Sequence, residues 1–466
     1  MAVRRKERST SGGNIYSPIA SPNASGNEMI GVYNRRWILL IILCLLTVIS
    51  NWVCFSMSAI EATASSSYPG LDFSVLVSVF NISNVVSCLF EPFFLRRIGL
   101  RRSVVIASFI MLFGNFVKMK NYENYDVTIY GMVAGFILVG LSQPIFQMGA
   151  LVLAQDWFPS TERSFVTAML VNSNQIGMVV AYVVGGIVVG EDSSKITPYL
   201  QYMTYSSLVC FVASVFLFKS LPPLPPSRSA ATKRQKPAVQ KSIVSYWKDS
   251  FKLMLCKNFN LAIFCYLVSS ASANVVSADL SVLLEEDEAS NVGTSTVAST
   301  FLGFMVIGTV LVGWYLNRTH LYKESSLVLL GLSSVTALAS GLCFEYGMFS
   351  GFWFFLLFFG LVSGPGMPLN VDLAVEVAYP KEENDVIFVI VVLSNASNTG
   401  LIWVCYWLRN VTPIPYLSVL YVLSALSLLT MTSFGCFFTG EYNRIKFDTE
   451  KIVSTSLITP RTVFSS

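Results

Sequence analysis

Charge is scarce in this chain of 466 residues, because Asp, Glu, Lys and Arg make up only 12% of it, against roughly 25% in a soluble domain. There is a single histidine, His320, and none of the nine cysteines forms a Cys-x-x-Cys pair. Membrane-bound acyl or phosphate chemistry would want a histidine–acid pair or clustered acids, and a metal site or disulfide framework would want paired cysteines. We therefore predict no catalytic residue, no metal and no cofactor.

Hydrophobic residues make up 53% of the chain, and they gather in runs long enough to cross a bilayer. Twelve runs are predicted to be membrane helices: 37–60, 73–95, 101–118, 127–155, 163–190, 199–219, 258–284, 292–316, 325–346, 350–378, 384–408 and 416–438. The sequence thus predicts an all-α membrane protein with the lipid bilayer as its surroundings. An amphipathic segment over 245–255 is either a helix on the membrane surface or a lead-in to the seventh run.

The distribution of Lys and Arg predicts the orientation. With both termini cytoplasmic, the outer loops keep only Lys118, Lys120, Lys195 and Arg409, which leaves 27 of the 31 basic residues inside (31 − 4 = 27). The net charge of +4 therefore reports topology and gives no reason to expect a nucleic-acid partner. The predicted organisation is a disordered cytoplasmic tail (1–34), a first half (35–219), a Pro- and Lys-rich cytoplasmic linker (220–257), a second half (258–440) and a cytoplasmic C-terminal tail (441–466).

An internal repeat supports the division into halves. The segment 142–174 matches 363–395 at an offset of 221, with seven identities in 33 positions, where background frequencies give about two. Ser142/Ser363, Pro144/Pro365, Pro159/Pro380, Glu162/Glu383, Val171/Val392, Ser173/Ser394 and Asn174/Asn395 are the shared residues. Repeated halves with a substrate site between them are typical of secondary transporters.

Two short basic loops join predicted helices, one from Pro92 through Gly99 and Arg101, and the other from Gly313 to Arg318. Both resemble the major facilitator loop signature, Gly-x-x-x-Asp-Arg-x-Gly-Arg-Arg. The resemblance implies a major facilitator fold of two pseudo-symmetric six-helix halves, with these residues in gating or structural roles. The acid of the signature is replaced by Arg96 and Asn317, and positive-inside charge is the alternative explanation.

Longer motifs are Trp52-Val-Cys-Phe-Ser in the first run, Gln143-Pro144 with Trp157-Phe158-Pro159, Asn174-Gln175-Ile-Gly177, and Pro368-Leu369-Asn370-Val-Asp372 with Glu376. Together they resemble the feline leukaemia virus subgroup C receptor-related family of major facilitators. The resemblance covers nearly the whole membrane domain. It implies a small organic solute as partner, choline or ethanolamine first, with haem and a pyridoxine-type vitamin as alternatives. It also implies a plasma-membrane location.

The same resemblance carries over substrate-binding residues. Trp52 matches the tryptophan of an aromatic cage, Gln175 matches a helix-five glutamine, and Asn395 stands where the family has a helix-eleven glutamine. The cage tyrosine of helix seven aligns with Ala278, and the helix-one asparagine aligns with Val48. As alternatives to substrate binding, Trp52 has a packing role, and the two amides form hydrogen bonds between helices.

Acidic residues within apolar runs are functional candidates by default. Glu61 and Asp279, near the outer ends of their runs, are candidates for ion coupling or for attracting a cation. Asp372 and Glu376 are one helical turn apart near the inner end of the tenth run, and we expect a structural or gating role for them. The sequence predicts a monomeric solute transporter that is not an enzyme. A receptor that binds without transport, and coupled or uncoupled transport, stay open.

Overall fold

The computed structural model describes residues 31–120, 124–159, 162–226, 242–285, 294–319, 321–379, 381, 383–411 and 418–440. Within these ranges the chain is helical, and twelve helices are long and apolar enough to span a membrane, which confirms the twelve predicted spans. Residues 1–30, residues 286–293, His320 and the C-terminal tail from 441 lie outside the described residues.

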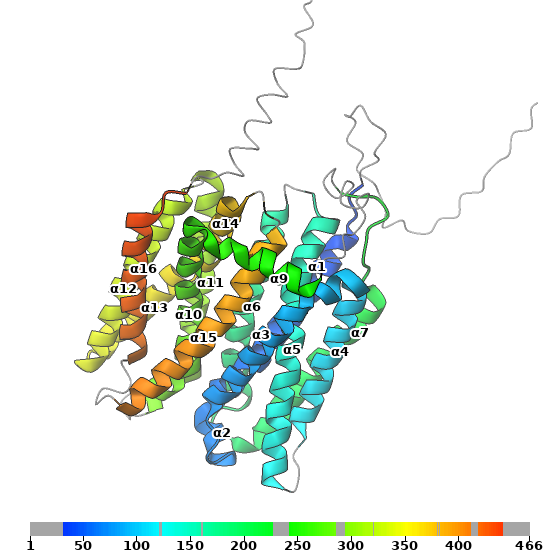
Figure 1. The fold of residues 1–466 in the computed structure, drawn as a ribbon. Coiled ribbons are helices and arrows are strands. Elements are labelled where there is room, and N and C mark those ends of the chain that lie inside the picture. The colour runs from blue at the N-terminus through cyan, green and yellow to red at the C-terminus, as the bar shows by residue number, and fades with distance from the viewer. Residues whose placement is uncertain are drawn as a thin grey trace, which may run out of the picture.

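The first group of six spans is formed by α1, α3, α4, α5, α6 and α7 (Figure 1). Their bounds, with the short helices between them, are α1 Arg35–Phe55, η1 Ser58–Ile60, α2 Glu61–Ser67, α3 Phe73–Ile98, α4 Leu100–Met119, α5 Tyr125–Trp157, α6 Arg163–Val188, η2 Ser193–Lys195 and α7 Ile196–Leu217. Gly99 joins α3 to α4 with a φ of 80°, a left-handed conformation that glycine adopts without strain.

The second group repeats this arrangement, with one span broken in two. Its bounds are α10 Lys257–Glu285, α11 Thr294–Thr319, α12 Tyr322–Glu345, α13 Phe349–Ser363, α14 Gly366–Ala378, α15 Glu383–Val411 and α16 Ser418–Phe437. The break between α13 and α14 falls at Gly364-Pro365, because proline cannot donate a helical hydrogen bond. Pro144, by contrast, lies inside the continuous helix α5.

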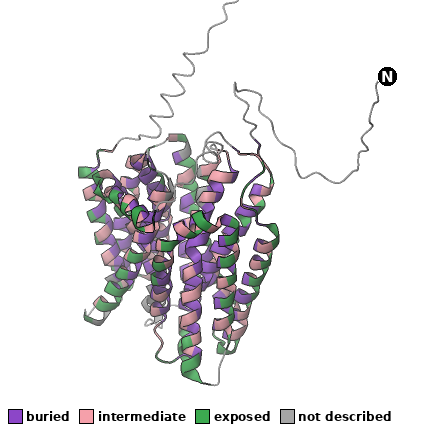
Figure 2. Cartoon of the chain, turned by 45° about the vertical axis from the view of Figure 1, so that its right-hand side comes forward, coloured by how far each residue is buried: buried purple, intermediate pink, exposed green. Residues whose placement is uncertain are grey.

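Two pairs of neighbouring helices join the groups: α3 lies beside α15, and α6 lies beside α11. Apolar side chains such as Ile41, Phe216 and Phe354 are more than half exposed on the outside, while buried residues fill the interior (Figure 2). An apolar exterior of this kind suits a bilayer better than water.

The segment predicted as amphipathic forms α9 (Ile243–Phe251) and η3 (Lys252–Leu255), and α9 crosses the end of the bundle where α1 begins (Figure 1). We call this end the linker side, and the other end the far side. Trp247 Nε1 donates to the Leu89 carbonyl of α3 at 2.8 Å, and Tyr246 stacks edge-on against Phe388 of α15. Burial raises the pKa of the Tyr246 hydroxyl, as does the nearby Asp385 carboxylate. The linker helix α9 thus contacts both groups of helices.

Candidate functional site

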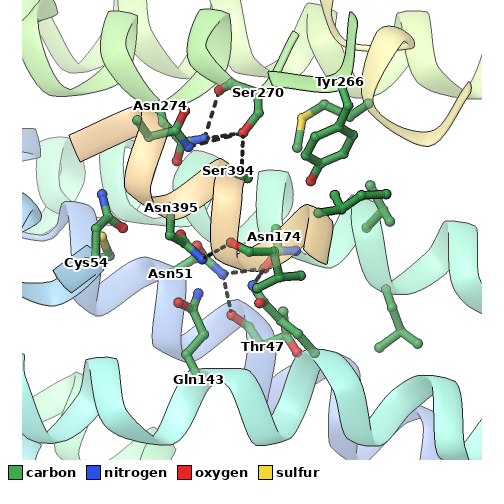
Figure 3. Close-up of a pocket in the computed structure, with 18 of the residues that line it drawn as sticks. Thr47, Asn51, Cys54, Gln143, Asn174, Tyr266, Ser270, Asn274, Ser394 and Asn395 are labelled. Carbon is green, nitrogen blue, oxygen red and sulfur yellow. Dashed lines mark hydrogen bonds between the residues drawn. The ribbon is translucent and has the colours of Figure 1, made fainter. Parts of the chain in front are cut away.

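A central cavity of about 100 Å³ lies between the two groups of helices (Figure 3). Its walls come from α1, α3, α5 and α6 on one side and from α10, α14 and α15 on the other. The polar lining residues are Thr47, Asn51, Cys54, Asn81, Gln143, Gln147, Asn174, Tyr266, Ser270, Asn274, Ser394, Asn395 and Asn398. Eight of these side chains are amides. No Asp, Glu, Lys, Arg or His is among the described residues of the lining, so the cavity is polar but uncharged.

Amides of the first half are tied together at Asn174. Its Oδ1 accepts from Asn51 Nδ2 at 2.7 Å and from Gln147 Nε2 at 3.2 Å, and Asn51 also donates to the Thr47 carbonyl. The contact requires α6 to lie very close to α1, and Gly177 permits this. A Cβ at Gly177 would lie 2.6 Å from the Val48 carbonyl oxygen.

A second chain of amides crosses between the halves. Asn395 Nδ2 donates to Asn84 Oδ1 at 2.9 Å, and Asn84 in turn donates to Gln143 Oε1. Asn84 is fully buried. On the second half, Ser270 Oγ hydrogen-bonds Ser394 Oγ at 3.1 Å and accepts from Asn398 Nδ2 at 3.1 Å. These bonds fix the orientation of most of the amide groups that face the cavity.

Several polar atoms of the lining have no partner in the described part of the chain. They are Thr47 Oγ1, Gln147 Oε1, Asn398 Oδ1 and Asn81 Nδ2, each of them buried. A buried polar atom without a partner costs about 1–3 kcal/mol. Two amide oxygens, one amide N–H group and one hydroxyl are therefore available to a bound molecule.

Of the three predicted substrate-binding residues, the structure places only Asn395 on the cavity wall. Trp52 lies in the last turn of α1, and its Nε1 donates to the Tyr199 hydroxyl at 3.0 Å, away from the lining. Gln175 is fully buried beside the cavity, with Nε2 3.4 Å from the sulfur of Met367, a lining residue of the other half.

Aromatic faces in the lining come from Phe80 and Tyr266. Tyr266 belongs to α10, the seventh span, where the sequence comparison pointed to Ala278; Ala278 is buried and does not line the cavity. In the sequence, the only sign that Tyr266 could line a cavity is its position inside a predicted span. The same holds for Asn51, Asn274 and Asn398, amides whose only sequence signal was polarity within a predicted span.

The predicted acids lie elsewhere. Glu61 begins α2 and lines a second cavity of about 540 Å³ on the far side, together with Glu191. Asp279 is in α10, but its side chain is outside the described residues. In α14, Asp372 is exposed and Glu376 is buried.

The basic-loop residues make contacts within their own halves. Arg101 Nη2 donates to the Val215 carbonyl of α7 at 3.2 Å, and the Arg318 guanidinium lies 4.2 Å from the Trp314 ring centroid. Neither guanidinium pairs with a carboxylate in the described ranges. A Cβ at Gly313 would meet nothing within 4 Å, so no close helix approach requires this glycine.

Comparison with known proteins agrees with this architecture. A family model described as Major Facilitator Superfamily matches residues 38–402, so the chain belongs to that superfamily and is a multi-pass membrane transporter. The D-xylose-proton symporter has the same fold, with a TM-score of 0.68 at 10% identity, over 87% of this chain and 98% of that one.

Two relatives confirm the narrower resemblance. The choline/ethanolamine transporter flvcr2a of Danio rerio is 26% identical over 371 residues, which cover 76% of each chain. Solute carrier family 49 member A3 of Xenopus tropicalis is 24% identical over 365 residues, covering 75% of this chain and 73% of the relative. The predicted resemblance to feline leukaemia virus subgroup C receptor-related transporters is therefore confirmed, as is the prediction that the chain is not an enzyme.

Proposed function

We propose that this transporter carries a small amino alcohol, ethanolamine or choline, through the central cavity by alternating access. The observation that carries the proposal is the pair of unpartnered amide oxygens in the lining, Gln147 Oε1 on the first half and Asn398 Oδ1 on the second. A single donor group held between them would be bound by both halves at once. The relatives' activity on choline and ethanolamine supports the same class of solute.

The chemistry of an amino alcohol matches the available atoms. Its ammonium can donate to Gln147 Oε1 and Asn398 Oδ1, while its hydroxyl oxygen can accept from Asn81 Nδ2. The faces of Phe80 and Tyr266 add attraction for the positive charge. The quaternary nitrogen of choline cannot donate, so we expect ethanolamine to bind more tightly than choline.

Alternating access requires contacts between the halves that break in turn. On the far side, the Tyr182 hydroxyl of α6 donates to the Ser277 carbonyl of α10. On the linker side, α9 contacts both α3 and α15. Opening either side breaks its own set of contacts and leaves the other in place.

The linker side is cytoplasmic in this proposal, because Arg35, Arg36, Arg96, Arg97 and Arg101 all lie at that end of the helices. The membrane is the plasma membrane. One chain supplies every wall of the cavity, so a monomer suffices.

The alternatives fit the cavity less well. Haem is much larger than a volume of about 100 Å³ accommodates, and no histidine is among the described lining residues to ligate its iron. The uncharged lining gives a coupling proton no carboxylate or histidine to bind, which supports facilitated diffusion. A receptor without transport would need no contacts that alternate between the two sides.

Uptake of radiolabelled ethanolamine by cells expressing the chain tests the proposal, with Gln147→Met and Asn398→Leu as variants. Losing one hydrogen bond to a charged group costs about 1.5–3 kcal/mol, so each variant should raise KM for ethanolamine about 10- to 150-fold. Choline uptake should change about threefold at most, since its nitrogen makes no hydrogen bond.

Asn115→Leu is the matched control. Asn115 is a fully buried amide of α4 that donates to Ser207, and its Oδ1 also has no partner, but it does not line the cavity. Its variant should transport normally once expression is matched. Saturable uptake in Gln147→Met and Asn398→Leu with unchanged KM would contradict the proposed binding mode, and no ethanolamine or choline uptake at all would contradict the substrate class.

A further inference from the structure

A third cavity lies on the far side, in the groove between the start of α3 and the end of α15. Its volume is about 120 Å³, and it is lined by Asp72, Ser74, Val75, Ser78, Ile402, Trp403 and Tyr406. It shares no residue with the central cavity. Asp72 precedes the lining residue Phe80 by eight positions on α3, which is about 12 Å along a helix. The groove therefore lies beyond the central cavity, toward the far side.

The polar groups of the groove are arranged around one carboxylate. Asp72 caps α3, with Oδ1 accepting from the backbone N–H and the hydroxyl of Ser74. Its other oxygen has no donor, and no basic side chain pairs with Asp72, within the described ranges. Ser78, one helical turn further along α3, also lines the groove and is 2% exposed. The negative charge of Asp72 is thus available to a ligand.

Two aromatic rings form the opposite wall. The Trp403 and Tyr406 ring centroids are 6.2 Å apart at an interplanar angle of 71°, so their faces meet as a corner. Both side chains are strongly exposed, at 50% and 41%. Tryptophan and tyrosine favour the boundary between hydrocarbon and water, which places this wall at the level of the lipid headgroups.

We propose that this groove binds a substituted ammonium group at the far surface of the membrane. The carboxylate supplies the opposite charge, and the two ring faces attract alkylated nitrogen through their quadrupoles. Ca²⁺ takes six to eight oxygen ligands, and the groove offers one carboxylate and two hydroxyl side chains besides the tyrosine. An anion would be repelled by Asp72. The ammonium comes either from the headgroup of a membrane lipid or from a free solute, and neither source requires that the central cavity carry an amine.

Fluorine NMR of the protein, labelled with fluorotryptophan, tests the site directly. The chain has eight tryptophans, and the Trp403 resonance is assigned by its loss in Trp403→Leu. In nanodiscs of phosphatidylglycerol, which has no ammonium headgroup, titration with choline chloride should shift the Trp403 resonance. The Trp407 resonance is the internal control, because Trp407 lies four residues on and is 59% exposed, but does not line the groove.

Asp72→Asn is the decisive variant, because asparagine still caps the helix but removes the charge. In this variant, the choline concentration that gives half of the Trp403 shift should rise about tenfold. Asn398→Leu should leave that response unchanged, so a failure of the proposed central site does not affect the outcome.

Nanodiscs of phosphatidylcholine distinguish the two sources. If the occupant is a lipid headgroup, Trp403 is already shifted in them and choline has no further effect; if it is a free solute, choline still shifts it. The proposal is overturned if neither choline nor the change of lipid moves Trp403 more than Trp407. It is equally overturned if Asp72→Asn leaves the response intact.

Discussion

Tyr182→Phe should shift the transporter toward the state that is open on the far side. The hydroxyl of Tyr182 donates to the Ser277 carbonyl across the two halves, and Tyr182 is fully buried. The Ser277 carbonyl keeps its bond within helix α10, so the variant loses only one hydrogen bond that is made when the far side is closed, worth about 0.5–1.5 kcal/mol. Since 1.4 kcal/mol is a factor of about ten, the closed-to-open ratio should fall about 2- to 13-fold.

Alkylation of Cys54 measures this shift. Cys54 lines the central cavity, and a variant that keeps it as the only cysteine reports access from either side. The rate of labelling by an impermeant maleimide applied to the far side should rise in Tyr182→Phe by up to the same factor.

Tyr199→Phe is the matched control. Tyr199 is also a fully buried tyrosine, but its hydroxyl accepts from Trp52 and donates to the Ala181 carbonyl, both within the first half. Removing the Tyr199 hydroxyl should lower the melting temperature of the protein without changing the rate at which Cys54 is labelled. An unchanged rate in Tyr182→Phe, or an equal rise in Tyr199→Phe, would refute the assignment of this contact as the far-side closure.

Two further substitutions test the packing that positions the site. Gly177→Ala places a Cβ 2.6 Å from the Val48 carbonyl and should reduce transport at least about tenfold at matched expression, whereas Gly400→Ala, with nothing within 4 Å, should transport normally. Arg36→Gln breaks the 3.0 Å pair with Glu162 and should destabilise the protein by about 2 kcal/mol, seen as a lower melting temperature. Arg35→Gln, which loses one exposed bond to the Leu217 carbonyl, should melt near the wild type, and equal melting of the two variants would contradict a structural role for the pair.

The spans were predictable because a bilayer imposes a length and a hydropathy on each helix, and both are visible along the chain. The break at Gly364-Pro365 was not predicted, because 350–378 forms one apolar run and the matching Pro144 leaves α5 continuous. The direction in which a side chain points depends on how helices pack. Trp52 hydrogen-bonds Tyr199 of another helix, and Tyr266 of α10 supplies the aromatic face on the second half of the cavity. Neither placement can be inferred from the sequence of one helix alone.

The amide network shows the same limit. Asn84 and Gln143 are 59 residues apart, and Asn395 joins them from the other half. Polarity within an apolar run marks such residues as candidates, since a buried amide needs partners. Which partners they find is a property of the assembled bundle.

Ethanolamine counterflow in sealed vesicles containing the purified protein tests the central claim most directly. Vesicles preloaded with unlabelled ethanolamine should accumulate labelled ethanolamine transiently, in a saturable manner and without an imposed ion gradient. Asn398→Leu should greatly reduce this exchange at low substrate concentration, while Asn115→Leu retains it. No exchange of ethanolamine or choline by correctly inserted protein would contradict transport of an amino alcohol through the amide-lined cavity.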